Sequence, residues 1–236
     1  MGPGRAAEII REGLYRGADG GYLLTDRAFA GADTLATSYA LATAIKKIGD
    51  YDIIIGGRQA IDGDTAQVGP QVAEKLGLTQ VTYAEEILNV DEKNRSITVK
   101  RHIDGGVETV EGPLPIVITV NGSAAPCRPR NAKLVMKYKR ALGAQEKAPA
   151  PACHPEGVSA LPYPELYEKR PYLNIPEWSV ADVNGDLAQC GLSGSPTKVK
   201  AIQNIVFQAK ESKTLTGSDK DVEDLIVELL ANHTIG

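Results

Sequence analysis

The sequence has few cysteines and no long apolar run, and each absence excludes a class of protein. Its 236 residues include only three cysteines, Cys127, Cys153 and Cys190, which lie far apart and form no CxxC pair. This spacing argues against a disulfide framework and a thiolate metal site, and it favours a reducing compartment. No apolar run reaches the roughly 20 residues that cross a bilayer, and the first residues lack the apolar stretch of a secretory signal. The sequence therefore predicts a cytoplasmic protein without membrane insertion.

The sequence also lacks an excess of positive charge. Acidic residues outnumber basic residues by 30 to 26, so no broad positive field attracts nucleic acid or an anionic membrane. We expect no nucleic-acid partner. Apolar residues make up 42% of the chain, which is enough to build the packed core of a globular protein.

Helical patterns recur along the first half of the chain. The spacing of apolar residues predicts helices over residues 5–17, 34–48 and 65–76. Asp33 can cap the second of these helices, and Gly49 can end it. The buried face predicted for that helix consists of Leu35, Tyr39, Ala42 and Ile45.

Strand patterns alternate with these helices. Residues 51–55 form an apolar, β-branched run that is typical of a strand covered on both faces, and a glycine-containing loop over 56–64 follows it. This succession predicts an α/β fold with a doubly wound, mostly parallel sheet. Alternating residues around Asp104-Gly105-Gly106 predict an antiparallel hairpin, and residues 114–120 predict a further buried strand.

The second half carries a proline-rich segment and an apolar terminal helix. Seven prolines between residues 148 and 176 exclude a long helix or a central strand there, so we expect an extended, ordered arm or a linker. Apolar residues within 218–233 share one helical face, and Ser218 with Asp221 forms a capping-box pattern. Such a helix beyond an arm requires a docking surface.

The strongest chemical signal is the loop that follows the strand at residues 51–55. In open α/β sheets ligands bind beyond the carboxyl ends of the strands, and free N–H groups at a helix start attract phosphate. The glycines allow close approach, and the Thr65 hydroxyl and the Gln67 amide can donate to phosphate oxygens. The loop therefore predicts a diphosphate site, although it is neither a P-loop nor a GxGxxG fingerprint.

A purely structural interpretation of this loop stays open. Its glycines are also turn residues, and Asp64 or Thr65 could simply cap the next helix. Asp62 and Asp64 could form a catalytic pair or a magnesium site, but carboxylates at a helix start more often stabilise the helix dipole. We expect no catalytic residue and no metal site.

Four motifs, in the same order along the chain, resemble those of electron-transfer flavoprotein β subunits. They are Gly57-Arg58-Gln59-Ala60-Ile61-Asp62-Gly63-Asp64-Thr65-Ala66-Gln67-Val68-Gly69-Pro70, Arg128-Pro129-Arg130-Asn131-Ala132-Lys133, Gly191-Leu192-Ser193-Gly194-Ser195-Pro196-Thr197-Lys198-Val199 and Asn232-His233-Thr234-Ile235-Gly236. The resemblance extends over nearly the whole chain. It implies a fold of the adenine-nucleotide-binding type and a subunit that works with an α subunit.

The first motif indicates the cofactor that the resemblance implies. Its Asp-Gly-Asp-Thr-Ala-Gln-Val-Gly sequence is similar to the branch of the family that binds FAD in this subunit, whereas the other branch holds AMP in the same pocket. The FAD branch implies NADH as electron donor, electron bifurcation, and a low-potential acceptor such as ferredoxin or flavodoxin. The implied cofactor-binding residues are Gly57, Arg58, Gln59, Ala60, Ile61, Asp62, Gly63, Asp64, Thr65, Ala66, Gln67 and Val68.

A basic segment over residues 123–140 resembles the recognition loop that anchors these flavoproteins to acyl-CoA dehydrogenases. An apolar residue inserts into the partner there, and Leu134 is the candidate anchor. The implied partner-binding residues are Arg128, Arg130, Lys133, Leu134 and Lys137. The alternatives are a solvated basic helix and a nucleic-acid patch, and the acidic balance of the chain weakens the latter.

The resemblance also implies an organisation of the chain. We expect an α/β nucleotide-binding domain over residues 1–146, a proline-rich arm over 147–177, a return to that domain over 178–210, and a tail over 211–236 whose helix docks on the partner subunit. Family members carry a strand, a loop, a helix and a second strand before the position that matches Met1. We therefore expect these strands to be missing here and the strand edges at 21–25 or 51–55 to be open.

Two functions from different classes follow. An electron-carrier subunit needs no acid–base constellation, because the flavin performs the redox chemistry. The alternative is a stand-alone adenine-nucleotide-binding or sensor protein without redox activity. The basic segment, the arm and the apolar terminal helix favour the partner-dependent subunit.

Overall fold

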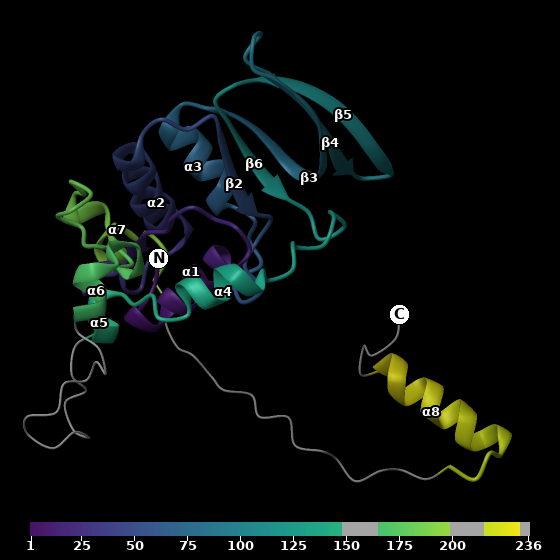
Figure 1. Cartoon of the computed structure of the whole chain (residues 1–236). Helices are drawn as coiled ribbons and strands as arrows, with labels where there is room; N and C mark the ends of the chain where they lie inside the picture. Colours follow the sequence, from purple (N-terminus) through teal and green to yellow (C-terminus); the bar gives the residue numbers. More distant parts are fainter. Residues whose placement is uncertain (148–164, 199–214, 232–236) are drawn as a thin grey trace, which may run out of the picture. The chain divides into compact units, whose positions relative to one another are not determined.

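The computed structural model describes residues 1–147, 165–198 and 215–231, which belong to two compact units, Met1–Lys198 and Val199–Gly236 (Figure 1). Most of the predicted arm, Cys153 and the motif at 232–236 lie outside the described residues. The domain boundaries drawn from the sequence stay predictions.

The larger unit contains helices and strands that alternate along its first half. Its helices are η1 (Gly4–Ala6), α1 (Ala7–Tyr15), η2 (Arg27–Phe29), α2 (Thr34–Ile48), α3 (Val68–Leu76), α4 (Ala132–Tyr138), α5 (Ala144–Lys147), α6 (Glu165–Lys169), η3 (Pro171–Leu173), η4 (Leu187–Gln189) and α7 (Gly191–Gly194). Its strands are β1 (Leu23–Leu24), β2 (Ile53–Gly57), β3 (Thr79–Asp91), β4 (Ser96–Ile103), β5 (Gly106–Pro113), β6 (Ile116–Val120) and β7 (Glu177–Trp178).

The main sheet has five strands in the order β2-β6-β3-β4-β5. Strands β2 and β3 both run parallel to β6, whereas β4 runs antiparallel to β3 and to β5. This arrangement confirms the predicted α/β class, and the predicted hairpin corresponds to β4 and β5. The antiparallel part is larger than predicted because β3 extends over 13 residues. Its first half pairs with β6 and its second half pairs with β4.

Strand β2 differs from its prediction. It lies at one edge of the main sheet, and Ile55 is 59% exposed, so the strand is not covered on both faces. Its Ile53 packs against the core of the sheet. The fully covered strand is β6, which lies between β2 and β3 and buries Ile116, Val117 and Ile118. A run of apolar residues could not distinguish the edge position from the central one.

Helices α2 and α3 lie side by side (Figure 1), and α3 packs on β6 and β3. The bounds of α2 and its cap are as predicted, because the Asp33 carboxylate accepts from the N–H groups of Leu35 and Ala36. Its predicted buried face is confirmed only in part. Ala42 is buried, whereas Leu35 is exposed, and the helix also buries Ala36, Ala40 and Ala44. Small side chains on this face allow close approach of neighbouring elements.

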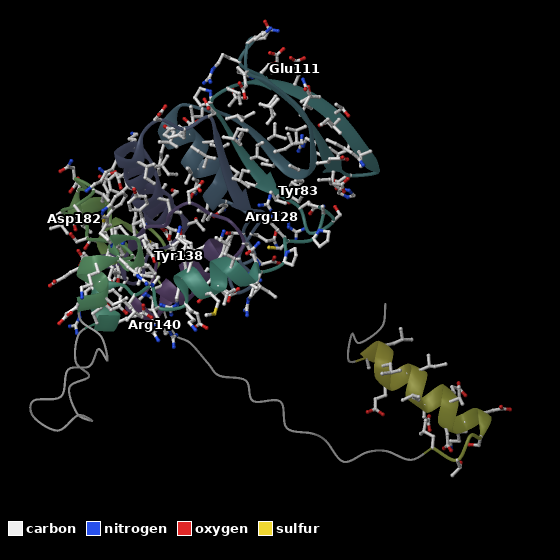
Figure 2. All side chains as sticks on the ribbon, in the orientation of Figure 1. Tyr83, Glu111, Arg128, Tyr138, Arg140 and Asp182 are labelled. Atoms are coloured by element: carbon white, nitrogen blue, oxygen red, sulfur yellow. The ribbon has the colours of Figure 1, made fainter. Side chains whose placement is uncertain are left out.

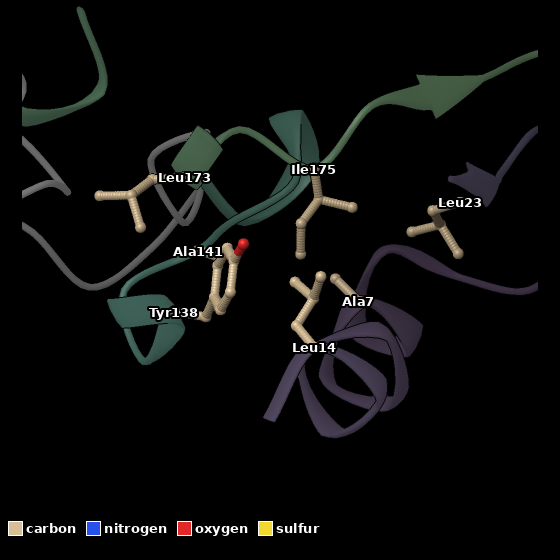
Figure 3. Packing of buried hydrophobic residues seen from close by; sticks show 7 residues of the cluster. All are labelled: Ala7, Leu14, Leu23, Tyr138, Ala141, Leu173 and Ile175. Atoms are coloured by element: carbon tan, nitrogen blue, oxygen red, sulfur yellow. The ribbon is translucent and has the colours of Figure 1, made fainter. Parts of the chain in front are cut away.

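The first core cluster joins the start of the chain to residues far along it. Figure 3 shows its members converging from α1, β1, α4 with the turn that follows it, and η3 with the residues that follow it. They are Ala7, Leu14, Leu23, Tyr138, Ala141, Leu173 and Ile175. Strand β7 extends this connection by pairing in parallel with β1, and Trp178 stacks on Tyr22 with ring centroids 4.1 Å apart. The chain thus returns to its first strand after residue 170.

The smaller unit contains helix α8 (Asp219–Ala231). Its start confirms the predicted cap, because the Asp221 N–H donates to the Ser218 hydroxyl at 3.3 Å. Within this unit, Val222, Ile226 and Leu230 are exposed and form part of the predicted apolar face. Over the part of the chain that the structure describes, no helix combines the length and apolar character that a bilayer crossing requires.

Candidate functional site

The carboxyl ends of the three parallel strands meet around Arg58. The Arg58 N–H donates to the Val120 carbonyl at 3.1 Å, which ties the end of β2 to the end of β6. Its guanidinium donates to Asn121 Oδ1 at 3.4 Å and faces the ring of Tyr83, which lies where β3 leaves β6. Tyr83 is labelled at this edge in Figure 2. A hollow of about 450 Å³ opens here and is lined by Arg58, Gln59, Val120, Asn121, Gly122 and Ser123.

The loop over residues 58–67 stands largely in solvent. Ile61, at its tip, is 99% exposed. The side-chain hydrogen bonds at the tip stay within the loop, from the Gln59 amide to Asp64 and from the Gly63 N–H to the Asp62 carboxylate. The side chains at the tip of the loop are therefore exposed to solvent and are not packed against the rest of the fold.

The backbone of this loop has two unusual conformations. Asp64 and Ala66 have φ values of +49° and +52°, a left-handed region that residues with a Cβ seldom adopt. Gln67, which follows Ala66, is right-handed. Successive residues of opposite hand turn their N–H groups toward a common point and form anion-binding concavities. Strain of this kind tends to gather at ligand sites.

Helix α3 begins three residues later than predicted and without a side-chain cap. Its N-cap is Gln67, and neither Asp64 nor Thr65 caps it, so the purely structural interpretation of these two residues is wrong. By contrast, Asp33 caps α2 and Asn131 caps α4. The first N–H groups of an α-helix have no intrahelical acceptor, and they carry the positive end of the helix dipole. The start of α3 therefore offers donors to an anion.

Two glycines at the end of β2 border this space. A Cβ added at Gly56 or Gly57 would meet no atom of the described residues within 4 Å, so packing within this part of the chain requires neither glycine. Gly69 differs, because a Cβ there would lie 2.3 Å from Thr119 Cγ2. This glycine lets α3 approach β6 closely. The donor set and the open glycines fit a diphosphate group.

This loop and residues 195–197 of the third motif both form hydrogen bonds to the start of α2. The Thr34 hydroxyl donates to Gln67 Oε1 at 2.8 Å, and the Asp33 N–H donates to Ser195 Oγ at 3.2 Å. The Thr197 N–H donates to the Asp33 carboxylate at 3.2 Å. Because Thr34 occupies the carbonyl oxygen of Gln67, the amide nitrogen of that side chain remains as a donor for a ligand.

The pKa of Asp33 reflects this junction. Burial alone would raise it, but hydrogen bonds from the N–H groups of Ala36 and Thr197 outweigh burial and hold the pKa below its usual value. The carboxylate is thus ionised where it joins the two motifs.

The basic segment has both packed and exposed side chains. Leu134 lies partly buried against the first core cluster, whereas Met136 on the same helix is 65% exposed. Arg130 forms an ion pair with Glu12 at 2.6 Å, and the Lys137 ammonium lies 4.6 Å from the centroid of the Tyr138 ring. The sequence pattern identified the charges but missed Met136, because helical spacing alone does not show which apolar residue faces the core.

The cysteine and histidine side chains considered next lie in surroundings that indicate a structural role. Burial raises the pKa of the Cys190 thiol, as expected for a packed cysteine, and its side chain belongs to the core around α2. His102 is half-exposed, as predicted, with Nδ1 3.5 Å from Glu85 Oε1. Among the described residues, no group of three metal-ligating side chains is present.

Comparison with known proteins agrees with these motifs. Residues 1–149 match the electron transfer flavoprotein domain family. The chain is 38% identical to protein FixA of Azorhizobium caulinodans over 232 residues, which is 96% of this chain and 71% of that protein. It is 41% identical to the electron transfer flavoprotein subunit beta of Megasphaera elsdenii over 208 residues, which is 86% of this chain and 64% of that protein. The corresponding subunit of Thermoanaerobacterium thermosaccharolyticum is 37% identical over 236 residues, covering 100% of this chain and 77% of that protein. The chain therefore belongs to the electron transfer flavoprotein family, in the group of FixA proteins and β subunits.

Proposed function

We propose that this chain is the nucleotide-binding β subunit of a cytoplasmic electron transfer flavoprotein. It pairs with an α subunit, and the complex carries electrons from NADH or acyl-CoA dehydrogenases to other redox carriers, including ferredoxin or flavodoxin by bifurcation. Family membership and the names of its relatives, FixA and electron transfer flavoprotein subunit beta, support the electron-transfer role.

The uncapped start of α3 beside the left-handed Ala66 carries the cofactor proposal. We assign FAD to this site, with AMP as the alternative, and the diphosphate lies against residues 57–68. The Thr65 hydroxyl, the Gln67 amide and the Arg58 guanidinium supply side-chain donors beside the backbone N–H groups. Bound FAD would supply the hydride and single-electron chemistry, while the protein supplies binding, orientation and electrostatics.

Two surfaces serve partners in this proposal. The basic segment with Leu134 docks on an acyl-CoA dehydrogenase, and the exposed Met136 adds an apolar contact there. The apolar face of α8 docks on the α subunit, where its exposed side chains lose contact with water.

The visible spectrum of the purified complex tests the cofactor proposal. The chain is co-expressed with its α subunit, dialysed, and assayed for flavin per complex. The double variant Thr65→Val/Gln67→Ala removes two donors to a charged group, each worth about 1.5–3 kcal/mol, so FAD should bind on the order of 100- to 10,000-fold more weakly. Thr109→Val/Gln80→Ala makes the same chemical changes at exposed strand positions and should keep full flavin content. Unchanged flavin stoichiometry in the first double variant contradicts the site.

The same preparations separate the carrier from a nucleotide sensor. If the chain is a carrier subunit, its complex with the α subunit is yellow, and the flavin in that complex can be reduced. A chain that remains colourless in the complex, and binds AMP equally well alone, supports the sensor function instead.

A further inference from the structure

Strand β3 has a bulge where it leaves β6. Their parallel pairing runs from Thr79 to Val81 and resumes at Ala84, so Thr82 and Tyr83 stand outside the regular register. Tyr83 has φ +58°, a left-handed conformation that is rare for a bulky side chain. Bulges beside functional sites commonly redirect a side chain.

Three neighbours fix this bulge. Arg101 donates to the Thr82 carbonyl at 2.9 Å and to the Thr82 hydroxyl at 3.0 Å. The Tyr83 N–H donates to Thr119 Oγ1 at 3.4 Å, and the Asn121 N–H donates to the Ala84 carbonyl at 2.8 Å. A strained conformation persists only where its surroundings determine it in this way. The direction of the Tyr83 side chain is thus set by the sheet.

The bulge turns the ring of Tyr83 toward Arg58. The Arg58 Cζ lies 5.6 Å from the ring centroid, within the range of a cation–π contact. The Asn121 amide oxygen accepts from the same guanidinium, and its nitrogen donates to Ser123 Oγ at 2.9 Å. Ring and amide thereby restrict a long side chain that would otherwise sample many rotamers.

The charge of Arg58 is not neutralised by this arrangement. No ion pair to Arg58 occurs among the residues that the structure describes. The nearby Glu85 carboxylate instead accepts from Ser123 at 2.5 Å and lies 3.7 Å from the Lys100 ammonium. A guanidinium has five N–H donors, so most of those of Arg58 remain for an anionic ligand in the adjoining hollow.

We propose that Tyr83 is a positioning residue that holds the Arg58 guanidinium toward an anionic group of the bound nucleotide. Tyr83 acts through Arg58 and does not itself bind the nucleotide. This inference rests on the proposed function, because it requires a nucleotide at the carboxyl ends of β2 and β6.

Nucleotide affinity of the complex with the α subunit tests the inference. Flavin-free complex is titrated with FAD and, separately, with AMP. Tyr83→Leu removes the π face and should weaken binding about 3- to 30-fold. Tyr83→Phe keeps the π face of the ring, so its affinity should stay within about 2-fold of that of the original protein. Arg58→Ala should weaken binding at least as much as Tyr83→Leu. Tyr83→Leu should cause no further loss in the Arg58→Ala background, because residues that act as a unit are not additive.

Tyr83→Gly separates positioning from folding. Glycine adopts a positive φ without strain, so this variant should unfold at an unchanged or higher temperature and still bind as weakly as Tyr83→Leu. Tyr83→Leu or Tyr83→Gly that binds like the original protein, or an additive loss in the double variant, overturns the inference while the site stands. If the unaltered complex binds neither FAD nor AMP, the proposed function fails, and the inference fails with it.

Discussion

The loop at residues 58–67 and helix α4 were both predicted to be functional, but the fold uses them differently. The loop is anchored near its ends, by Arg58 to β6 and by Gln67 to Thr34, and its tip stands in solvent. Helix α4 contributes Tyr138 to the first core cluster and packs Leu134 against it. Substitutions at the loop tip therefore report on binding directly. In α4 the same experiment also changes the packing of the core.

The boundary between the loop and α3 should give the largest effect on stability. Gly69→Ala places a methyl group 2.3 Å from Thr119 Cγ2, on a buried, β-branched side chain of the inner strand β6. Overpacking of this kind costs about 1–3 kcal/mol, partly offset by the better helix propensity of alanine. We expect a lower midpoint in urea unfolding, followed by the fluorescence of Trp178.

A second substitution identifies the cause. Thr119→Ser removes Cγ2 but keeps the hydroxyl, so it should restore most of the loss in the Gly69→Ala background. Gly63→Ala, whose Cβ meets no atom within 4 Å, should leave the midpoint unchanged. If Gly69→Ala is as stable as Gly63→Ala, α3 does not need this close approach.

Two apolar residues of α4 can separate the role of this helix in core packing from its proposed role in docking. Leu134→Ala removes a partly buried side chain and should lower the free energy of unfolding by roughly 1–2 kcal/mol, below the range for fully buried leucines. Met136→Ala changes an exposed side chain and should stay within about 0.5 kcal/mol. Both variants are then compared for binding to an acyl-CoA dehydrogenase. Weaker docking of Met136→Ala at unchanged stability supports the proposed surface. If only Leu134→Ala binds more weakly, the loss is explained by disturbed packing of the core.

The smallest effect concerns the junction at Asp33. Removing an N-cap typically costs about 1 kcal/mol, so Asp33→Ala should be less stable by that amount at neutral pH. The pKa of Asp33 is lowered in the folded state, so its contribution from ionisation is fully present above the ordinary aspartate pKa of about 3.9 and is lost as the pH falls through the lower folded value. The stability difference between the two proteins should therefore shrink at acid pH. A difference that stays constant from pH 7 to pH 2 contradicts the role of the carboxylate charge.

Several elements could be predicted because their signals are local. Asp33 and Gly49 mark the ends of α2, the turn at Asp104-Gly105-Gly106 joins β4 to β5, and the apolar run after residue 114 forms β6. The position of the loop after β2 was likewise visible in the succession of a strand, glycines and a helix. These features depend on propensities and caps within a few residues.

The amino-acid sequence by itself determined the α/β class, the caps of α2 and α8, and the place in the chain of the loop that follows β2. Tertiary structure alone decided that β2 lies at an edge, that Leu134 faces the core, and that Arg58 meets Tyr83 across the sheet. It also joined Asp33 to Thr197, 164 positions later. Such contacts depend on which strands and helices become neighbours, and no local pattern encodes that choice, because edge and central strands or inward and outward helix faces differ only in what packs against them.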